Sequence, residues 1–437
     1  MKRTRVLGSL LVGAALIVGA CGGGASPTPA ASAPPAASAT PAATEPPAAT
    51  PPADALRVVK ILPGEPVHIA FWGVLSGADA SLGTDSKYGV QIAIDDQGGK
   101  LFGHDIQLTS EDGLCTPEGG ATAGQKLAAD STLVGLIGSS CSDETVGGIK
   151  AITEAGLTTI SPSNTRPALT AADRGPEYAG YLRTAHNDEV QGKVAAEFAY
   201  NSLGVKTAAT IHDGSSYAQA LQQVFADEFT KLGGTITLQE AVDKTATDMK
   251  PVLTRIAATK PDFIYYPIFI AAGGYITKQI KEVPGLENTK HMSADGTFSA
   301  DFVKAAGDAA IGHYISSPDV TAFTGDYAGF VAKYQAKFGS KPLSIFHAHA
   351  YDATGMLFAA LQKVTVQAAD GTLYVPLGAL RDALFATKDF QGVTGTLTCT
   401  PTGDCGAKAI GVYQITAKEV GPPISWPPAA PIWKPTS

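Results

Sequence analysis

Hydrophobic and polar positions in the first half of the chain predict a repeating order of strand and helix. Residues 67–72 form a β-rich apolar run that ends at glycine, and residues 88–96 carry the spacing of a helix. The same order returns with a strand at 106–108, an Ala-rich helix at 120–130 and a buried strand at 133–137. Repeated β-α-β units predict a parallel, doubly wound sheet with right-handed crossovers.

A second series of the same kind begins near residue 205. A strand at 205–212 precedes a long amphipathic helix at 217–232 and a strand at 235–238, and a helix at 247–258 precedes a buried strand at 262–266. Because no Pro/Ser-rich linker separates the two series, we expect an α/β fold with two lobes packed face to face. Open α/β sheets bind ligands at the carboxyl ends of their strands, so a cleft between the lobes is the expected ligand site.

The chain begins with the pattern of an export signal over residues 1–21. Basic residues among the first five precede an apolar run at 7–18, which is too short to span a bilayer. Small residues at 18–20 (Val-Gly-Ala) stand directly before Cys21, and this order resembles a bacterial lipobox. We therefore expect Cys21 to be lipidated and to anchor the chain to the cell membrane, facing the extracytoplasmic side. An ordinary cleaved signal with an incidental cysteine is the alternative.

Low-complexity segments flank the part of the chain that is expected to fold. Residues 22–64 form a linker, composed up to about residue 54 of little besides Ala, Pro, Ser, Thr and Gly, and residues 419–437 form a Pro-rich tail. With almost no large apolar residue, the linker cannot offset the entropy of ordering, so we expect it to be disordered. Its prolines would make it a semi-stiff stalk between the lipid and the folded part.

Composition and charge narrow the classes of partner. Hydrophobic residues make up 44% of the 437 and charged residues 16%, which is typical of a globular chain. Acidic residues number 40 against 32 basic ones, for a net charge of -8. No basic run follows Arg5, so the sequence argues against a nucleic-acid partner. No later segment is apolar enough to span a bilayer, so we expect contact with the membrane through the lipid anchor only.

Apart from Cys21, the chain has four cysteines, Cys115, Cys141, Cys399 and Cys405. An even set in an exported protein predicts disulfides, and four cysteines allow three pairings. Proximity in the sequence favours the pairs Cys115–Cys141 and Cys399–Cys405. No CxxC motif or Cys/His ligand spacing is present, so we expect neither a metal ion nor a cofactor.

Catalytic patterns are weak in this sequence, and we expect no enzyme activity. Ser142 lies in no G-x-S-x-G elbow and has no nearby base. His347 and His349 are two residues apart in a helical stretch, where their side chains diverge, and this favours packing over metal binding. The glycine pair at 98–99 matches neither a P-loop nor a dinucleotide fingerprint.

Several short segments occur in an order and spacing that resemble one protein family. They are residues 71–77, 98–99, 112–115, 138–145, 161–165, 212–217, 261–266 and 351–353. Over roughly residues 65–418 the chain is similar to the periplasmic branched-chain amino acid binding proteins, which have the type I periplasmic binding fold. The resemblance implies two Rossmann-like lobes with doubly wound parallel sheets that close around a ligand by a hinge.

The resemblance also implies how the chain is divided between the lobes. Three crossovers join them, and we place these near residues 183–186, 316–318 and 395–399. The first lobe then comprises residues 65–185 and 317–396, and the second comprises residues 186–316 and 397–418. Each lobe is therefore discontinuous in sequence.

Two loops of small polar residues are expected to bind a ligand carboxylate. Ser142 follows a buried strand and precedes a helix at 143–155, so we expect it to be the N-cap of a helix whose free N–H groups favour an anion. The resemblance implies that Ser142 contacts the carboxylate and that Ser163, Asn164 and Thr165 belong to a second carboxylate-binding loop. Ser163 and Thr165 would supply the donors, whereas Asn164 replaces a smaller residue. The alternative is that both loops are ordinary caps and turns.

The residues for the ligand's ammonium group and side chain are assigned through the resemblance. Asp295 matches a carboxylate that contacts the ligand amine, commonly glutamate, and the shorter aspartate implies a deeper ligand or a bridging water. A simple turn at Asp295 and Gly296 is the alternative. Tyr217 matches a tyrosine that touches the polar end of the ligand on closure. Leu82 stands where the family often has an aromatic residue and Phe269 where it has tyrosine, and both predict an aliphatic or aromatic ligand part.

The resemblance gives the two expected disulfides different roles. Cys115–Cys141 matches a disulfide of the family's first lobe and would brace the loop that holds Ser142. Closing such a loop is worth about 3 kcal/mol in the chain-entropy model. Cys399–Cys405 has no counterpart that we expect, so it would be a local staple.

The sequence as a whole predicts an exported solute-binding lipoprotein that captures an amino acid, aliphatic or branched-chain, by closure of its lobes. It would act as a monomer and deliver the ligand to the permease subunits of an ABC importer. Relatives in the family take urea, short amides or aromatic acids, and for those ligands a partner at Asp295 would be optional. A ligand-sensing role for the same fold is a further alternative.

Overall fold

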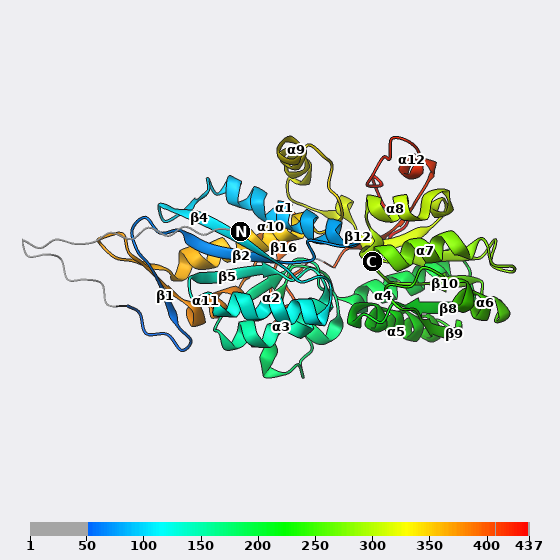
Figure 1. The fold of residues 1–437 in the computed structure, drawn as a ribbon, viewed down its shortest axis with the longest axis horizontal. Helices are drawn as coiled ribbons and strands as arrows, with labels where there is room; N and C mark the ends of the chain where they lie inside the picture. The colour runs from blue at the N-terminus through cyan, green and yellow to red at the C-terminus, as the bar shows by residue number, and fades with distance from the viewer. Residues whose placement is uncertain (1–50, 407, 436–437) are drawn as a thin grey trace, which may run out of the picture. The chain divides into compact units, whose positions relative to one another are not determined.

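The computed structural model describes residues 51–406 and 408–435, which form two lobes (Figure 1). The predictions for the export signal at 1–21, for lipidation of Cys21 and for linker residues 22–50 lie outside the described residues. Within the described ranges, no helix is both long enough and apolar enough to cross a membrane.

The first lobe is built on a six-stranded sheet in the order β3-β4-β2-β5-β6-β7. Its strands are β2 (Val67–Gly73), β3 (Lys100–Leu101), β4 (His104–Asp112), β5 (Leu133–Gly138), β6 (Thr159–Ser161) and β7 (Tyr181–Arg183). All pair in parallel except the short β3, which returns antiparallel on β4. Every residue of β2 is buried, as expected for a parallel strand that is covered on both faces.

Two pairs of helices cover the two faces of this sheet (Figure 1). On one face α1 (Ala80–Asp96) packs against α10 (His347–Val364), and on the other α2 (Pro117–Ala129) packs against α3 (Ser142–Glu154). This lobe also contains α9 (Tyr327–Phe338), α11 (Leu377–Phe385) and the hairpin of β15 (Phe390–Gln391) and β16 (Thr396–Leu397). The layered arrangement is the doubly wound architecture that the sequence predicts.

The second lobe repeats this plan with a six-stranded sheet in the order β17-β12-β11-β10-β8-β9. Its strands are β8 (Thr207–His212), β9 (Thr235–Ala241), β10 (Phe263–Tyr265), β11 (Lys290–Ser293), β12 (Tyr314–Pro318) and β17 (Ile410–Gln414). Only β17 pairs antiparallel, with β12. This lobe contains the helices α4 (Asp188–Glu197), α5 (Ser216–Lys231), α6 (Lys250–Ala258), α7 (Ile270–Ile280) and α8 (Ala300–Ala306).

The chain passes between the lobes three times, and the third passage differs from the prediction. The sequence predicts it near 395–399, but Leu397 and Cys405 belong to the buried core of the first lobe. The reason is backbone pairing with the edge strand β7. Arg183 N–H donates to Gly403 O at 2.9 Å, and Cys405 N–H donates to Arg183 O at 3.0 Å. The assignment of residues 397–405 to the second lobe is therefore wrong.

Part of the predicted linker is folded. β1 (Val58–Ile61) pairs antiparallel with β14 (Leu373–Pro376), and β13 (Val366–Gln367) extends the same small sheet. Val59 and Ile61 are buried in the first lobe. The prediction of a disordered linker as far as residue 64 is wrong for this strand, because two apolar side chains on one face of it offset the entropy of ordering.

The Pro-rich end of the chain packs on the second lobe. After the short helix α12 (Ala417–Val420), Trp426 is buried against Phe298, with ring centroids 4.8 Å apart. Trp433 then forms an antiparallel bridge with Val412 of β17. The buried side chain of Trp426 and the backbone bridge at Trp433 therefore hold this Pro-rich segment on the second lobe.

Candidate functional site

A cavity lies between the lobes and is lined by residues from both. The atoms around it enclose about 320 Å³, including the part that opens to solvent. The lining residues are Leu82, Ser140, Cys141, Ser142, Ser163, Tyr217, Phe269, Asp295, Gly296 and Phe346. Six of the eight predicted ligand-binding residues are among them, namely Leu82, Ser142, Ser163, Tyr217, Phe269 and Asp295. Their contact with a ligand stays a prediction.

The cavity forms where the carboxyl ends of parallel strands from both sheets meet. Ser140 and Ser142 follow β5, and Ser163 follows β6. From the second lobe, Asp295 follows β11 and Tyr217 lies in the first turn of α5. Open parallel sheets gather their loops and helix N-termini at this edge, so short polar side chains from distant parts of the sequence come together there.

The first-lobe wall presents hydroxyl groups beside the N-terminus of α3. Cys141 is the N-cap of this helix and Ser142 is its first residue, so the prediction that Ser142 is the N-cap is wrong by one position. Ser142 Oγ accepts from Arg166 N–H at 3.4 Å, and the Ser163 hydroxyl donates to Ser140 O at 2.8 Å. The buried hydroxyl of Ser140 has no partner among the described residues. A helix N-terminus with hydroxyl groups beside it favours an anion.

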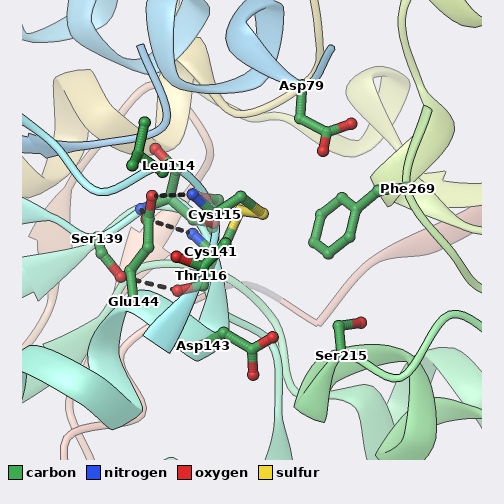
Figure 2. The surroundings of a disulfide bond; sticks show 12 residues. Asp79, Leu114, Cys115, Thr116, Ser139, Cys141, Asp143, Glu144, Ser215 and Phe269 are labelled. Carbon is green, nitrogen blue, oxygen red and sulfur yellow. Dashed lines mark hydrogen bonds between the residues drawn. A yellow bond between two sulfur atoms is a disulfide. The ribbon is translucent and has the colours of Figure 1, made fainter. Parts of the chain in front are cut away.

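A buried carboxyl group that the sequence analysis does not single out lies behind this wall. Glu144 is fully buried and accepts backbone N–H bonds from Ser140, Cys141 and Cys115, each at 2.9 Å (Figure 2). Burial raises the pKa of Glu144 to about 7, although these backbone bonds act to lower it. The bonds fix the backbone that carries Ser140. A glutamate in the first turn of a helix is a common feature, so the sequence gives no signal of this role.

Both predicted disulfides are formed. Cys115–Cys141 joins the loop after β4 to the start of α3, so it links the same two segments that Glu144 holds (Figure 2). Cys399–Cys405 closes a short loop beside β7. The first disulfide therefore borders the cavity, whereas the second lies in the first lobe just before the last crossover.

The second-lobe wall presents one carboxylate, Asp295, in a turn after β11. Asp295 is 2% exposed, and its Oδ1 accepts from the Tyr217 hydroxyl at 2.6 Å, from Gln191 Nε2 at 3.2 Å and from Gly296 N–H at 3.1 Å. A Cβ atom at Gly296 would come within 3.1 Å of the Tyr217 ring, so glycine allows the tyrosine to reach Asp295. Asp295 thus begins a turn and also faces the cavity, and the two interpretations made from the sequence are compatible.

His186 lies beside Asp295 on the first crossover. Its Nε2 atom is 3.7 Å from Asp295 Oδ2 and 2.7 Å from Gln191 Oε1. Burial lowers the pKa of His186, although Asp295 acts to raise it. A neutral His186 therefore donates its Nε2 proton to Gln191, whose amide group donates in turn to Asp295. This relay fixes the side chain of Gln191 toward the carboxylate.

A second buried carboxyl group, Asp188, accompanies Asp295. Asp188 is the first residue of α4, is fully buried, and neither of its oxygens has a hydrogen-bond partner among the described residues. Burial and the charge of Asp295 raise the pKa of Asp188 well above its ordinary value. Protonation of Asp188, or a cation bound nearby, would relieve the unfavourable burial of two neighbouring carboxyl groups. An aspartate at a helix start looks like an ordinary first-turn residue in the sequence, so only the fold identifies this pair.

Two of the predicted site residues do not line the cavity. Asn164 is buried, and its Oδ1 accepts from the hydroxyls of Thr145 at 2.6 Å and Ser139 at 3.2 Å. Thr165 is also buried, and its carbonyl oxygen accepts from Asp188 N–H at 3.0 Å. Both residues hold the loop after β6 in place, while Ser163 of the same loop reaches the cavity.

Phe346 is an apolar lining residue that the sequence analysis does not find. It precedes α10 and is 4% exposed, with its ring 6.2 Å from that of His186 and 5.3 Å from that of His349. No local motif marks it, because its position depends on the return of the chain to the first lobe. His347 Nδ1 lies 2.8 Å from Asp85 Oδ2, so it takes part in packing, as predicted. Among the described residues, no group of three or more side chains has the arrangement of a metal site.

Comparison of the sequence with known proteins identifies a matching protein family. A model of the periplasmic binding protein family matches residues 66–419. An amino acid binding protein of Pseudomonas aeruginosa is 29% identical over 243 residues, which are 55% of this chain and 63% of that protein, just under two thirds of its length. The Leu/Ile/Val-binding protein BraC3 of Rhizobium johnstonii is 25% identical over 348 residues, 79% of this chain and 90% of that protein.

Solved structures agree with the fold. The branched-chain amino acid transporter substrate binding protein LivJ from Streptococcus pneumoniae, in complex with isoleucine, has a TM-score of 0.70 at 24% identity and covers 80% of this chain and 97% of its own. A solute binding protein of an ABC transporter from Rhodopseudomonas palustris, in complex with 3,4-dihydroxy benzoic acid, has a TM-score of 0.66 at 22% identity and covers 79% and 92%. At these identities the likeness is one of fold.

The family resemblance and the fold class inferred from the sequence are thereby confirmed. The family model covers most of the chain, and the solved structures span both lobes. The chain belongs to the periplasmic binding protein family, whose members bind small-molecule ligands outside the cytoplasm, and it has the type I fold.

Proposed function

We propose that this protein captures an amino acid with an aliphatic or branched side chain and delivers it to an ABC importer. The observation that carries the proposal is the polarity of the cavity. Hydroxyl groups beside the N-terminus of α3 form one wall, and the carboxylate of Asp295 forms the other. A zwitterion has matching groups at its polar end. Each of its charges requires a partner in a desolvated cleft, because an unpaired ion would cost several kcal/mol.

In this proposal the ligand carboxylate binds at Ser140, Ser142 and Ser163, and the ammonium group binds at Asp295. The orphan hydroxyl of Ser140 supports the first assignment, because it is a buried donor in need of an acceptor. The neighbouring carboxyl groups of Asp188 and Asp295 support the second assignment. A cation beside the two groups relieves the repulsion between them.

The remaining lining residues are apolar and favour an aliphatic ligand side chain. Leu82 and Phe346 belong to the first lobe and Phe269 to the second, and all are less than a tenth exposed. The Leu/Ile/Val-binding relatives support this assignment, because the alignment with one of them, BraC3, covers 79% of this chain. The protein would act as a monomer with ABC permease subunits as partners and a lipid anchor at Cys21, and would carry out no chemistry on its ligand.

An aromatic acid is the second candidate ligand. Phe269 and Phe346 offer ring faces, and the Rhodopseudomonas palustris structures hold benzoic acids in the same fold. Such a ligand would use the anion wall but would leave Asp295 without a cation. The two candidates therefore differ in one residue that can be tested. Urea and short amides would likewise make no ionic use of Asp295.

The test is a thermal-shift panel on the chain from residue 22 onward, after unfolding and refolding to remove any bound ligand. The panel contains the amino acids, urea, short amides and aromatic carboxylates. A ligand at a hundred times its dissociation constant adds about 2.7 kcal/mol to the free energy of unfolding, a shift of a few degrees. We expect a shift with leucine, isoleucine or valine that Asp295→Ala abolishes. A shift with benzoates alone would instead favour the aromatic acid, and no shift with any solute would reject both.

The lipid anchor has its own test. In a bacterial host fed a labelled fatty acid, we expect the full chain to incorporate label and Cys21→Ser to lose it. Incorporation by Cys21→Ser would show that the anchor, if any, lies elsewhere.

A further inference from the structure

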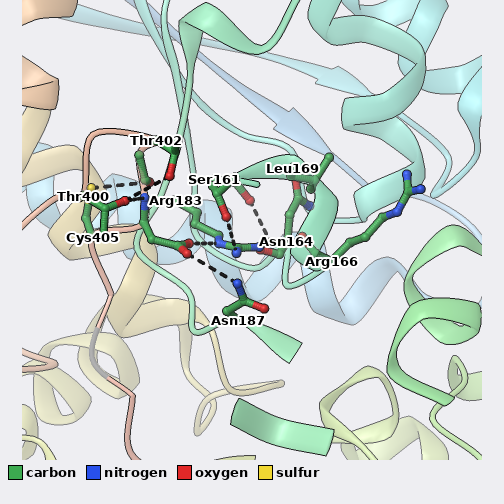
Figure 3. A network of polar contacts seen from close by, with 12 residues as sticks. Ser161, Asn164, Arg166, Leu169, Arg183, Asn187, Thr400, Thr402 and Cys405 are labelled. Atoms are coloured by element: carbon green, nitrogen blue, oxygen red, sulfur yellow. Dashed lines mark hydrogen bonds and ion pairs between the residues drawn. The ribbon is translucent and has the colours of Figure 1, made fainter. Parts of the chain in front are cut away.

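Arg183, at the end of β7, is fully buried, and its guanidinium donates hydrogen bonds to four other residues (Figure 3). Its Nε donates to Asp404 Oδ1. Its Nη1 donates to Asn164 O at 3.2 Å and to Arg166 O at 2.9 Å, and its Nη2 donates to the Thr170 hydroxyl at 2.6 Å. The five donors of a guanidinium are fixed in one plane, so this side chain sets the relative positions of all the groups that it contacts.

The backbone that Arg183 holds belongs to the loop after β6. Carbonyl groups at Asn164 and Arg166 stand on either side of Thr165, and the same loop presents Ser163 to the cavity. Ser163 N–H and Asn164 N–H both approach Ser161 Oγ, at 3.2 and 2.9 Å. Ser161 therefore fixes the start of the loop, and the guanidinium of Arg183 fixes its continuation at residues 164–166.

Asp404 is the ionic partner of that guanidinium. Burial acts to raise the pKa of Asp404, but the charge of Arg183 and hydrogen bonds from neighbouring side chains hold it below its ordinary value. Asp404 lies inside the loop closed by the Cys399–Cys405 disulfide. Within that loop Asp404 N–H donates to Thr400 Oγ1 at 3.0 Å, and Thr400 N–H donates to Asp404 O at 2.8 Å. The disulfide and these bonds keep Asp404 facing Arg183.

We infer that Arg183 is a positioning residue of the candidate site and that the stapled loop 399–405 acts on the cavity through it. Asp404 holds the guanidinium, the guanidinium holds the backbone at 164–166, and that backbone sets the orientation of Ser163 at the anion wall. The Cys399–Cys405 disulfide then contributes to ligand binding although neither cysteine lines the cavity. The geometric part of the inference stands by itself, and only its consequence for affinity rests on the proposed function.

Hydrogen exchange tests whether Asp404 and Arg183 fix the backbone at 164–166, and it needs no ligand. The sample is the refolded, oxidised chain from residue 22 onward. Asp404→Asn removes the charge and keeps the side-chain volume. We expect amides in the peptide 161–170 to exchange about tenfold faster in this variant, since local opening is no longer opposed by the ion pair. A double variant, Cys399→Ser with Cys405→Ser, keeps the charge and is expected to show a smaller acceleration in the same peptide.

Asp352→Asn is the matched control. Asp352 is also a buried first-lobe carboxyl group that holds a loop, because it accepts from Val393 N–H at 2.7 Å and from Thr394 N–H at 2.8 Å. Its loss should accelerate exchange at 392–395 and leave 161–170 unchanged. Wild-type exchange at 161–170 in Asp404→Asn, or equal acceleration there in the control, would overturn the inference. If Asp404→Asn does not fold, the double cysteine variant takes its place. Wild-type exchange at 161–170 in that variant would then overturn the inference.

Affinity for L-leucine gives the second readout. We expect the dissociation constant to rise about tenfold in Asp404→Asn and to stay unchanged in Asp352→Asn, with Asp404→Glu restoring most of the loss. An unchanged dissociation constant together with faster exchange would overturn the link between the loop and binding. If wild type does not bind leucine or any other amino acid, the proposed function fails, and the exchange experiment still decides whether Arg183 positions the loop.

Discussion

Asp79 in the first lobe accepts a hydrogen bond from the backbone N–H of Ile270 in the second lobe, at 3.1 Å. Ile270 is the first residue of α7, so a carboxylate from one lobe lies at the positive end of a helix in the other. The arrangement recurs nearby, where Asp143 Oδ1 accepts from Ser216 N–H, the first residue of α5, at 3.0 Å. Figure 2 shows Asp79 and Asp143 on opposite sides of the Cys115–Cys141 disulfide. Two hydrogen bonds from first-lobe carboxylates to helix N-termini of the second lobe therefore join the lobes in this structure.

The first prediction concerns this contact between the lobes. Asp79→Ala removes the bond to α7 and the ion pair with Lys244, whose Nζ lies 3.8 Å from Asp79 Oδ2. A carboxylate at a helix N-terminus is worth up to about 2 kcal/mol, and Asp79 is buried, so we expect its loss to let the lobes of the apo protein separate and the ligand to bind roughly tenfold more weakly. The radius of gyration from small-angle X-ray scattering and the dissociation constant for L-leucine measure the two effects.

Asp112→Ala is the control for that experiment. Asp112 also accepts a backbone N–H bond, from Leu75 at 3.0 Å, but both residues belong to the first lobe. It should lower stability without opening the cleft. An Asp79→Ala protein with the radius of gyration and the leucine affinity of wild type would show that the contact does not hold the lobes together.

The second prediction concerns the bond between Tyr217 and Asp295. Tyr217→Phe removes the hydroxyl that donates to Asp295 Oδ1 at 2.6 Å and leaves the ring in place. Hydrogen bonds to charged groups contribute about 1.5 to 3 kcal/mol, so we expect leucine affinity to fall at least about tenfold. Tyr266→Phe is the matched control, since its hydroxyl bonds to Thr277 and to His291 inside the second lobe. Equal affinities for wild type and Tyr217→Phe would remove this tyrosine from the site.

The order of strands and helices could be predicted from the sequence because buried parallel strands consist of runs of apolar residues. The predicted strand at 133–137 agrees with β5 (Leu133–Gly138) within one residue. The helix predicted at 88–96 starts at Ala80, because its first turns bury Asp85 and Ser86. Hydrophobic spacing does not detect polar side chains that face the interior. Asp85 can be buried because the Tyr334 hydroxyl and His347 donate to it.

The sequence predicts a residue of the candidate site where its place along the chain, such as the end of a strand, also fixes its place in the fold. It does not predict residues that reach the cavity through contacts between distant segments. Ser142 and Ser163 follow strand ends, so their place at the cavity follows from the topology of a parallel sheet. Ser140 and Phe346 reach the same cavity through backbone conformation and a chain return that no local pattern specifies. Glu144 looks like a solvated first-turn residue in the sequence, and only the three backbone bonds that it accepts reveal its role.

The third prediction concerns Glu144 and pH. Its folded-state pKa, about 7, lies above the ordinary value of 4.5, so between these values the folded protein binds more protons than the unfolded chain. The stabilising contribution is complete below about pH 4.5 and is lost as the pH rises through 7. At about 1.4 kcal/mol for each pH unit of difference, the loss amounts to about 3 kcal/mol. We expect this fall to be absent from the pH dependence of the unfolding free energy of Glu144→Gln.

Urea unfolding between pH 4 and 8 measures the effect, and Asp352→Asn serves as its control. Burial raises the pKa of Asp352 to about 6 from 3.8, so its own contribution is lost at lower pH. The difference between wild type and Asp352→Asn should therefore develop mainly between pH 4 and 6, and that for Glu144→Gln should continue to pH 7. Parallel stability curves for wild type and Glu144→Gln would contradict the prediction.

The fourth prediction concerns the proton held by Asp188, which lies beside Asp295. Burial and the charge of Asp295 raise the pKa of Asp188, so its contribution to stability is present in acid and is lost as the pH rises. An ammonium group at Asp295 favours ionisation of Asp188, and binding of leucine should therefore release a proton. Calorimetry at one pH in phosphate and in Tris buffer detects the release, because the two buffers take up a proton with different enthalpies. In Asp188→Asn we expect the binding enthalpy to be the same in both buffers. A buffer-independent enthalpy in wild type would show that Asp188 releases no proton when leucine binds.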